Sequence, residues 1–296
     1  MRRSRTLVSL IALSFVLSAC GSSSSDSGSD SNAQGQEGVL APYDASKAGG
    51  TLTLVAKGAA GTLDPHINYT LQFWQLYQAT YDGLLAFRKV DGPKSFETVP
   101  DLAEALPELS DGGKTLTFTL RKGIKFSDGR DVTVNDVKAS FERIFKVLSP
   151  TAGGFYNGIV GADACLANPA TCKLDQGVIV DPATNKIEIK LTAPDATINY
   201  KLSLPHAVIL PADAPSKDAG TTPIPTTGPY MFASYDPNKE LKMVRNPNFT
   251  EWNREAQPAG YPDEIVYQFG LTAEAQVNAI KNGQADWMLD PIPADR

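Results

Sequence analysis

The sequence predicts a mixed α/β fold, because segments with the periodicity of β-strands alternate along the chain with segments that have the periodicity of α-helices. Apolar residues recur at every second position from Leu116 through Phe118 to Leu120, as in a strand with one buried face. The period then changes, and one helical face collects Val134, Val137, Phe141, Ile144, Phe145 and Leu148. A chain of 296 residues, 42% hydrophobic and 20% charged, can form one or two domains with a substantial core.

The stretch 101–145 predicts a strand, a second strand, a turn and a helix. The glycines of Asp111-Gly112-Gly113 suit the turn before the first strand. Ile124 and Phe126 continue the apolar alternation, which predicts the second strand. Thr133 is followed three residues later by Asp136, a spacing typical of a helix that begins with a capping box.

The same patterns predict elements in the rest of the chain. A helix follows the turn at Asp64-Pro65, with an apolar stripe made of Leu71, Trp74, Leu76, Tyr77, Thr80 and Tyr81. Strands are expected at 51–55, 186–191 and 263–267, a strand pair between 227 and 246, and a last helix at 273–282.

Composition and motifs argue against several function classes. The net charge is −6 with an isoelectric point near 5.1 and no basic stripe, so nucleic acid and anionic lipid surfaces are not expected partners. Gly113-Lys114-Thr115 fails as a phosphate loop, because Glu108 stands where the first glycine belongs. No nucleophile elbow or singled-out carboxylate pair occurs in the globular part. We expect no enzymatic activity, no cofactor and no metal site, and structural, hydrogen-bonded roles for His66 and His206.

The N-terminus predicts export. Arg2, Arg3 and Arg5 precede a short apolar run at 7–16, and Leu-Ser-Ala-Cys follows at 17–20. This arrangement resembles a bacterial lipoprotein signal, which implies cleavage after residue 19 and acylation of Cys20; an ordinary secretory signal is the alternative. Two or three acyl chains hold a protein firmly, so the protein would be anchored to the outer face of the membrane. Residues 20–49, rich in Ser and Gly, would be a flexible tether.

Two cysteines remain beside Cys20. Cys165 and Cys172 are close in the sequence, and outside the cytoplasm such a pair favours a disulfide. The alternative, a metal site, needs more ligands than the two histidines supply.

Four blocks of the sequence resemble one family. They are the signature LAE, LSDGGKTLTFTLRKGIKFSDG and VTVNDV within 101–137, LDPH with YDGLL, TGPY with RNPNF and Trp252, and DEI with GQADW at 283–287. Together they resemble the solute-binding proteins of peptide-type ABC importers, the family 5 oligopeptide- and dipeptide-binding lipoproteins. The resemblance covers nearly all of residues 50–296.

The resemblance implies a periplasmic-binding-protein type II-like fold. Residues 50–81 and 212–296 would form a discontinuous first lobe, and residues 82–211 an α/β domain inserted in it. The family continues into a second lobe where this sequence stops at Arg296, so we expect a fragment or a truncated gene, with the second lobe missing.

Function and site residues also follow from the resemblance. It implies a monomeric extracytoplasmic receptor that captures peptides between its lobes and delivers them to the ABC permease. The candidate ligand-binding residues are Asn68, Tyr69, Thr70 and Leu71, then Phe155 and Tyr156, then Trp287, Met288, Leu289 and Asp290. Asp290 would pair with a ligand amine.

Two alternatives remain open. The same architecture can bind another small solute, such as a nickel chelate, an oligosaccharide or an opine-like compound. A surface lipoprotein of another class, with signalling, adhesive or hydrolytic work, or a nonfunctional truncated product, is the other reading of the sequence.

Overall fold

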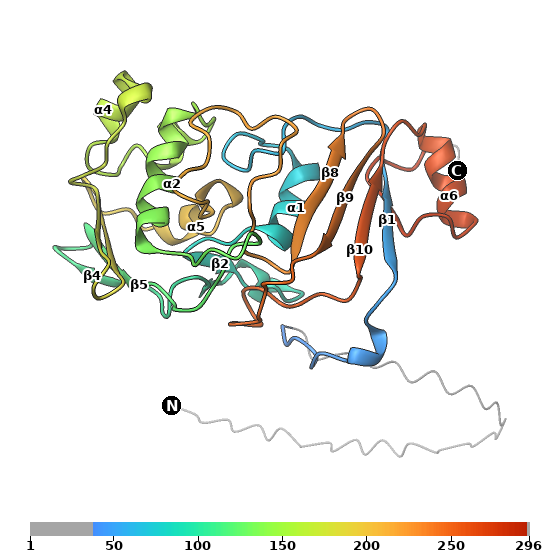
Figure 1. The fold of residues 1–296 in the computed structure, drawn as a ribbon, viewed down its shortest axis with the longest axis horizontal. Helices are drawn as coiled ribbons and strands as arrows, with labels where there is room; N and C mark the ends of the chain where they lie inside the picture. The colour runs from blue at the N-terminus through green and yellow to red at the C-terminus, as the bar shows by residue number, and fades with distance from the viewer. Residues whose placement is uncertain (1–37, 295–296) are drawn as a thin grey trace, which may run out of the picture. The chain divides into compact units, whose positions relative to one another are not determined.

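The computed structural model describes residues 38–294, which contain a five-stranded mixed sheet (Figure 1). Its strands follow the order β11-β1-β10-β9-β8, and the pair predicted between residues 227 and 246 is formed by β8 and β9. β1 is parallel to β10 and β11, whereas β8, β9 and β10 are antiparallel neighbours. The strands are β1 (Thr51–Val55), β8 (Tyr230–Asp236), β9 (Glu240–Arg245), β10 (Glu264–Gln268) and β11 (Trp287–Met288).

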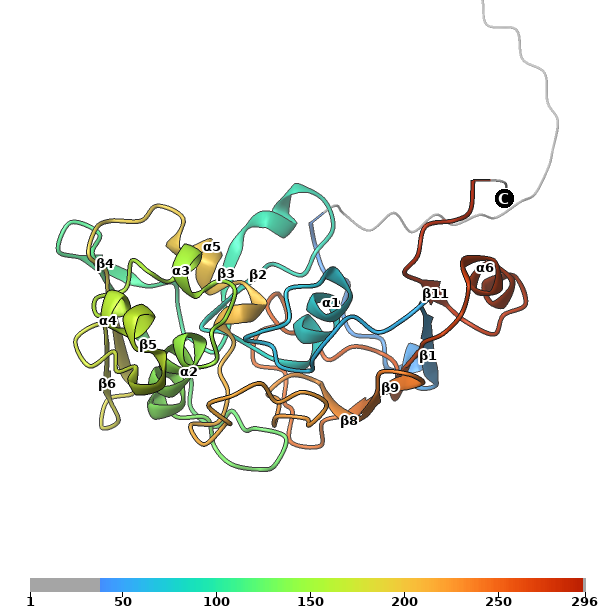
Figure 2. The same ribbon diagram turned by 90° about the horizontal axis from the view of Figure 1, so that it is seen from above.

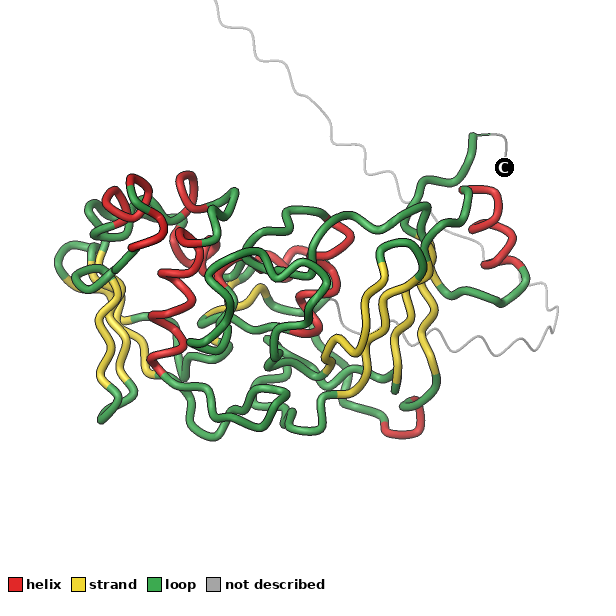
Figure 3. Tube along the Cα trace, turned by 45° about the horizontal axis from the view of Figure 1, so that its top comes forward, coloured by secondary structure: helices red, strands yellow, loops and turns green. Residues whose placement is uncertain are grey.

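A second, antiparallel sheet lies on the other side of α1 (Leu71–Thr80), with the order β4-β5-β7-β6 (Figures 1 and 2). Its strands are β4 (Glu108–Ser110), β5 (Thr115–Thr119), β6 (Val178–Asp181) and β7 (Lys186–Lys190). A short ribbon pairs β2 (Leu85–Phe87) with β3 (Thr98–Pro100). Figure 3 shows the two larger sheets at opposite ends, with helices and loops between them. The mixed α/β class predicted from the sequence is confirmed.

The remaining helices are short apart from α2 (Val134–Lys146). They are α3 (Ala152–Phe155), α4 (Ala162–Ala167), α5 (Ile198–Leu202) and α6 (Ala273–Lys281), and the 3-10 turns η1 (Ala45–Lys47), η2 (Pro93–Phe96), η3 (Pro169–Thr171) and η4 (Pro205–Ala207). Within residues 38–294, no helix has the length and hydrophobicity needed to cross a bilayer.

Each large sheet has its own hydrophobic core. The core of the four-stranded sheet draws all its buried residues from 84–209, among them Phe118, Phe141 and Ile189. The main core of the five-stranded sheet draws its residues from 56–81 and 208–269. The extended segment 207–210 serves both: Ala207 and Ile209 enter the first core, whereas the alternate residues 208 and 210 enter the second.

A buried ion pair joins the two cores. Arg143 on α2 donates to both carboxylate oxygens of Asp64, over 2.8 and 2.5 Å, and both side chains are almost fully buried. Arg143 also donates to the carbonyl of Pro215, and Asp64 accepts from the backbone amide of Ala219. The pair is therefore satisfied in the interior, which such a pair requires to be tolerated there.

The helix α2 begins as predicted and ends earlier. Thr133 and Asp136 form the capping box, with Asp136 accepting from the backbone and the hydroxyl of Thr133. The placement of Leu148 on the helical face was wrong, because the helix ends at Lys146 and Leu148 is 70% exposed with φ of 56°. Pro150 follows two residues later and disfavours a helical conformation of the residue before it, so the chain turns here.

The second predicted strand, around Ile124 and Phe126, does not form. A single bridge between Lys125 and Asp131 stands in its place. The amide of Phe126 donates to the carbonyl of Arg130, which closes a tight loop. Gly123, at φ of 81°, turns the chain away from β5 before any ladder can extend.

Two further expectations need correction. Leu71 is 69% exposed and does not belong to the apolar stripe of α1, whereas Phe73, one position from Trp74, is fully buried.

Part of the predicted tether packs on the protein: Tyr43 stacks on Tyr261 with ring centroids 5.1 Å apart, and Arg254 donates to the carbonyl of Ala41. Residues 41–47 are therefore not a free linker.

Candidate functional site

The loop before α1 is organised by Asn68. This buried side chain donates to the carbonyls of Ala60 and Thr62, over 2.9 and 2.7 Å, and accepts from the amide and the hydroxyl of Thr70. All its hydrogen-bonding atoms are used within the loop. Asn68 and Thr70 therefore hold this loop in place through these groups.

Tyr69 is presented outward by this loop. Its ring is 54% exposed, stacks on His206 with centroids 5.2 Å apart, and meets the edge of Trp74 at 4.9 Å. Trp74 is itself held by a hydrogen bond from Nε1 to the carbonyl of Asn68. With the exposed Leu71 next to it, Tyr69 offers an apolar surface on a rigid support.

The second predicted group lies close to Tyr69. Tyr156, after α3, is fully buried, and its hydroxyl donates to the carbonyl of Lys201 over 2.9 Å. Burial raises the pKa of Tyr156 above its usual value, and the neighbouring Tyr69 adds to the effect. Phe155 is half-buried, with its ring 6.3 Å from that of Tyr156. Phe155 and Tyr156 are therefore held at the end of α3, with Tyr69 near enough to affect the Tyr156 hydroxyl.

The two histidines, His66 and His206, have different surroundings. His66 is structural, as expected, with Nε2 3.0 Å from the carbonyl of Val208. His206 is buried between Tyr69 and Trp74, and the backbone of Ile67 is the one polar group that acts on its ring as a hydrogen-bond partner among the described residues, outside ideal geometry. Burial lowers the pKa of His206 to about 4, against the opposing effects of the backbone of Ile67 and of Asp64, and the ring is neutral at pH 7.

The third predicted group begins on β11, the edge strand next to β1 in the five-stranded sheet, on the other side of α1 (Figure 2). Trp287 is 37% exposed, and Met288 and Leu289 are half-buried. Asp290 accepts from the backbone amide of Lys57 and from Nε2 of Gln276, both over 2.7 Å. This carboxylate therefore already fastens residue 290 to the end of β1.

Comparison with known proteins assigns the family. Residues 97–296 match the profile of the bacterial extracellular solute-binding proteins, family 5. The chain belongs to this family. Among its relatives is the probable D,D-dipeptide-binding periplasmic protein DdpA of Escherichia coli K12, 30% identical over 79% of this chain and 42% of that protein. The di/tripeptide-binding protein 1 of Pseudomonas aeruginosa is 26% identical over 82% of this chain and 45% of its own length.

Solved structures share the fold of this family 5 protein. The clavulanic acid biosynthesis oligopeptide binding protein 2 superposes with a TM-score of 0.69 at 29% identity, covering 81% of this chain and 43% of that one. The pheromone receptor PrgZ has a TM-score of 0.68 at 23% identity, over 80% and 46% of the two chains. The predicted periplasmic-binding-protein type II-like fold is therefore confirmed. The chain spans less than half the length of these relatives.

Two of the three cysteines of this family 5 protein form a disulfide. The sulfurs of Cys165 and Cys172 are bonded at 1.99 Å, and both residues are buried against the core of the four-stranded sheet. Cys20, the predicted lipidation site, lies outside the described residues, as does the predicted signal at 1–19.

Sequence reasoning missed three contributors to the site. Arg143 ties α2 to the loop that carries Asp64, but it looks like an ordinary polar residue on an amphipathic helix. Trp74 and His206 form the platform under Tyr69 although 132 positions separate them in the sequence. In the sequence, only the high aromatic content of residues 69–77 indicated such a cluster.

Proposed function

We propose that this chain is part of an extracytoplasmic solute receptor that captures peptides and delivers them to an ABC permease. The observation that carries the proposal is the family match over residues 97–296, together with relatives that are named for binding dipeptides, tripeptides or oligopeptides. The protein would bind its ligand without transforming it. Ligand binding would favour a closed form only to the extent that the ligand contacts that form better.

We also propose a division of the chain in keeping with the two cores. Residues 50–81 and 212–296 would form the first lobe around the five-stranded sheet, and residues 82–211 the inserted domain around the four-stranded sheet. The separation of the buried residues into 84–209 and 56–81 with 208–269 supports this boundary. The segment 207–210, with side chains in both cores, would be the return crossing.

Tyr69 and Leu71 are the residues we propose to touch the ligand first. Both are exposed, and the loop that carries them is held by buried hydrogen bonds, so little conformational entropy is lost when a peptide packs on them. Trp287 is a third proposed contact at the other side of α1. Asn68, Thr70 and Tyr156 would position these groups through the hydrogen bonds that they already make. Asp290 accepts both of its printed hydrogen bonds through one oxygen, which leaves the other oxygen to pair with a ligand amine.

A screen of the full-length protein by thermal shift tests the proposal. Di- to hexapeptides should raise the melting temperature, by an amount that corresponds to about 2.7 kcal/mol at a ligand concentration 100 times the Kd. Tyr69→Ala and Leu71→Ala should weaken the shift at least several-fold. Leu109→Ala, at an equally exposed position on the edge strand β4, should leave it unchanged.

A second candidate ligand class is an opine-like compound. The agropinic acid complex of AgaA superposes with a TM-score of 0.59 at 26% identity. Stabilisation by an opine-like compound, with none by peptides, would replace the peptide proposal with this one.

We propose that Cys20 carries lipid and anchors the protein to the outer face of the membrane. The sequence of residues 17–20 supports this proposal. Labelled palmitate should enter the wild-type protein in bacterial cells, and Cys20→Ser should be unlabelled and released from the membrane fraction. Equal labelling of both forms would refute the anchor.

A further inference from the structure

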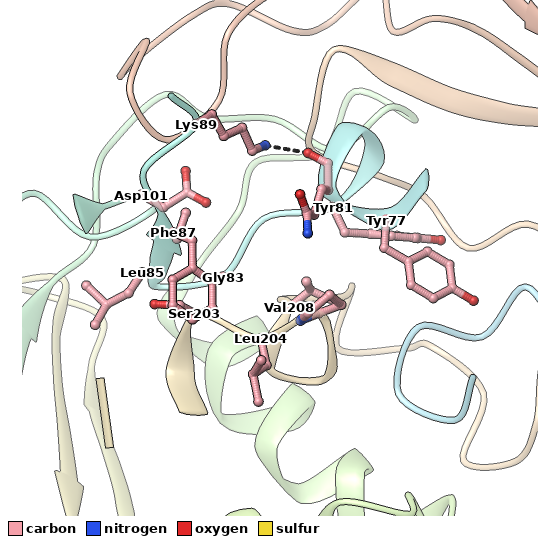
Figure 4. Close-up of a pocket in the computed structure, with 13 residues that line it drawn as sticks. Tyr77, Tyr81, Gly83, Leu85, Phe87, Lys89, Asp101, Ser203, Leu204 and Val208 are labelled. Atoms are coloured by element: carbon pink, nitrogen blue, oxygen red, sulfur yellow. Dashed lines mark hydrogen bonds between the residues drawn. The ribbon is translucent and has the colours of Figure 1, made fainter. Parts of the chain in front are cut away.

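An inner cavity lies where the end of α1, the ribbon strand β2 and the segment 203–208 meet (Figure 4). Its volume is about 40 Å³, and Asp101 and Lys89 are among the residues that line it. An outer cavity of about 560 Å³ adjoins it, because Gln78, Phe87 and Lys89 line both. None of the ten residues proposed from the sequence as ligand contacts lines either cavity.

Asp101 and Lys89 line the inner cavity, and the carboxylate of Asp82 lies beside that of Asp101. Asp82 and Asp101 are each 2% exposed. Asp82 accepts from the hydroxyl of Thr227 and from Nε2 of Gln257, both over 2.6 Å, and Asp101 accepts from Nε1 of Trp252 over 3.0 Å. The Lys89 ammonium donates to the carbonyl of Gln78 and to Oε1 of Gln257.

The charges of this cluster do not balance. If all three groups were ionised, one negative charge would remain without a partner in the interior, where such a charge is costly. Arg121 donates to the main-chain oxygen of Asp101 and not to its carboxylate. Arg88, which lines the outer cavity, is paired with Glu97 and Glu255. Tyr77 and Tyr81 also line the cavity, but their hydroxyls donate to the carbonyls of Thr62 and Ile224.

A bound proton supplies the missing charge in the free protein. Burial and the neighbouring Asp82 raise the pKa of Asp101 well above its usual value, although Lys89 opposes them. Burial likewise raises the pKa of Asp82. Both shifts favour a proton shared by the two carboxyl groups, which would balance the charge of the free protein.

We propose that the joined cavities bind a small primary amine that carries an apolar tail or ring. The inner cavity has room for a group the size of an ammonium ion, which needs no more space than a water molecule. The ammonium pairs with Asp101 and replaces the proton of the acid pair. The tail lies in the outer cavity along Phe87 and Val90 toward the exposed ring of Phe96.

The same arrangement excludes acids. A carboxylate in the inner cavity would bring a third negative charge to a cluster with one lysine, and like charges in a low-dielectric site repel strongly. Phenethylamine and 3-phenylpropionate are a matched pair of probes, since they share the ring and differ in the sign of the charge. Phenylethanol is the neutral analogue.

Calorimetric titration of the full-length protein with phenethylamine tests the site. Binding is expected, with release of close to one proton, seen as a dependence of the heat on the ionisation enthalpy of the buffer. Affinity should rise with pH, by up to about tenfold per unit while the acid pair still holds its proton. Phenylpropionate and phenylethanol should bind at least tenfold more weakly.

Variants separate this site from surface attraction and from the peptide site. Asp101→Asn keeps an oxygen for Trp252 and should lose at least tenfold in affinity and all proton release. Phe96→Ala should lose a few-fold. Glu97→Gln removes an exposed carboxylate near the mouth, and Tyr69→Ala changes the proposed peptide contact; both should bind the amine as the wild type does.

Any one of three results with the wild-type protein would overturn the proposal: no heat of binding with phenethylamine, an affinity for phenylpropionate equal to that for phenethylamine, or amine binding without proton release. These comparisons use the wild-type protein, so they hold even if Asp101→Asn does not fold. Amine binding that survives in a folded Asp101→Asn protein would equally refute the assignment.

Discussion

At the scale of single residues, the buried acids of this protein respond to pH in opposite directions. Burial alone would raise the pKa of Asp64, but the hydrogen bonds and charge of Arg143 outweigh it and lower that pKa. Asp101 has no such bidentate partner, and its pKa is raised. The difference depends on which charge faces each carboxylate, since both are buried.

Asp101→Asn should therefore stabilise the protein at neutral pH. Because the folded pKa lies above the unfolded value of about 3.9, the folded state binds the proton more tightly, and stability falls as pH rises through this window. The asparagine of the variant does not ionise, so the variant does not lose stability in this way. Its gain in stability over the wild type should therefore grow from pH 4 to pH 8. Melting temperatures at both pH values measure this, and an advantage that is constant or largest at pH 4 would contradict it.

The cap of α2 allows a second test on one residue. Thr133→Ala removes both side-chain contacts with Asp136 and should lower the free energy of unfolding by about 1 kcal/mol. Thr133→Ser keeps a hydroxyl and should cost much less. Urea denaturation of the three proteins compares them, and equal losses for Ala and Ser would rule out the capping role.

At the scale of elements, the disulfide holds α4 next to η3, and both pack against α2. The closed loop is short, with Cys165 and Cys172 seven positions apart. Chain entropy predicts about 2–3 kcal/mol for a loop of this length. The double variant Cys165→Ser/Cys172→Ser should lose about this amount.

Urea unfolding with and without a reductant measures the effect of the disulfide. The wild type should become less stable in the reductant, whereas the double variant should not change. A reductant effect of equal size on both proteins would mean that the bond contributes nothing in solution.

At the scale of the whole molecule, the Arg143–Asp64 pair is a buried ionic connection between the two cores. Arg143→Met leaves Asp64 buried without its cation and should cost about 3–5 kcal/mol. It should also separate the unfolding of the two cores, so that the calorimetric and van't Hoff enthalpies differ.

The double variant Arg143→Met/Asp64→Asn is the control for this prediction. It also removes the buried Asp64 carboxylate, which the single variant leaves without a cation. It should therefore recover part of the lost free energy of unfolding, as a double-mutant cycle would show. A fully additive loss would mean that the two side chains do not act as a pair.

Acid should weaken the same connection. The lowered pKa of Asp64 means that its contribution is present above the unfolded value of about 3.9 and is lost as pH falls through the lower, folded pKa. Wild type should lose stability on acidification below pH 4 more steeply than the double variant, which lacks this group. Thermal melts from pH 5 to pH 2 measure both slopes.

Local patterns determined much of this protein without the structure. Periodicity alone identified β1, β5, β7, β10, α2 and α6, because the alternation of apolar residues reflects which side of each element is buried. The capping box at Thr133 was equally visible, since both partners lie within one helical turn. The family motifs then predicted the fold and the peptide-binding class.

Only the tertiary structure decided what depends on residues far apart in the chain. The buried pair of Asp64 and Arg143, the platform of Trp74 and His206 under Tyr69, and the unbalanced charges of Asp82, Asp101 and Lys89 all join segments that no local pattern connects. It also decided that Leu71 and Leu148 face solvent, although their spacing predicted burial. The reason is physical: periodicity records the average side of an element that is buried, whereas charge balance and hydrogen-bond satisfaction depend on which partners the completed fold supplies.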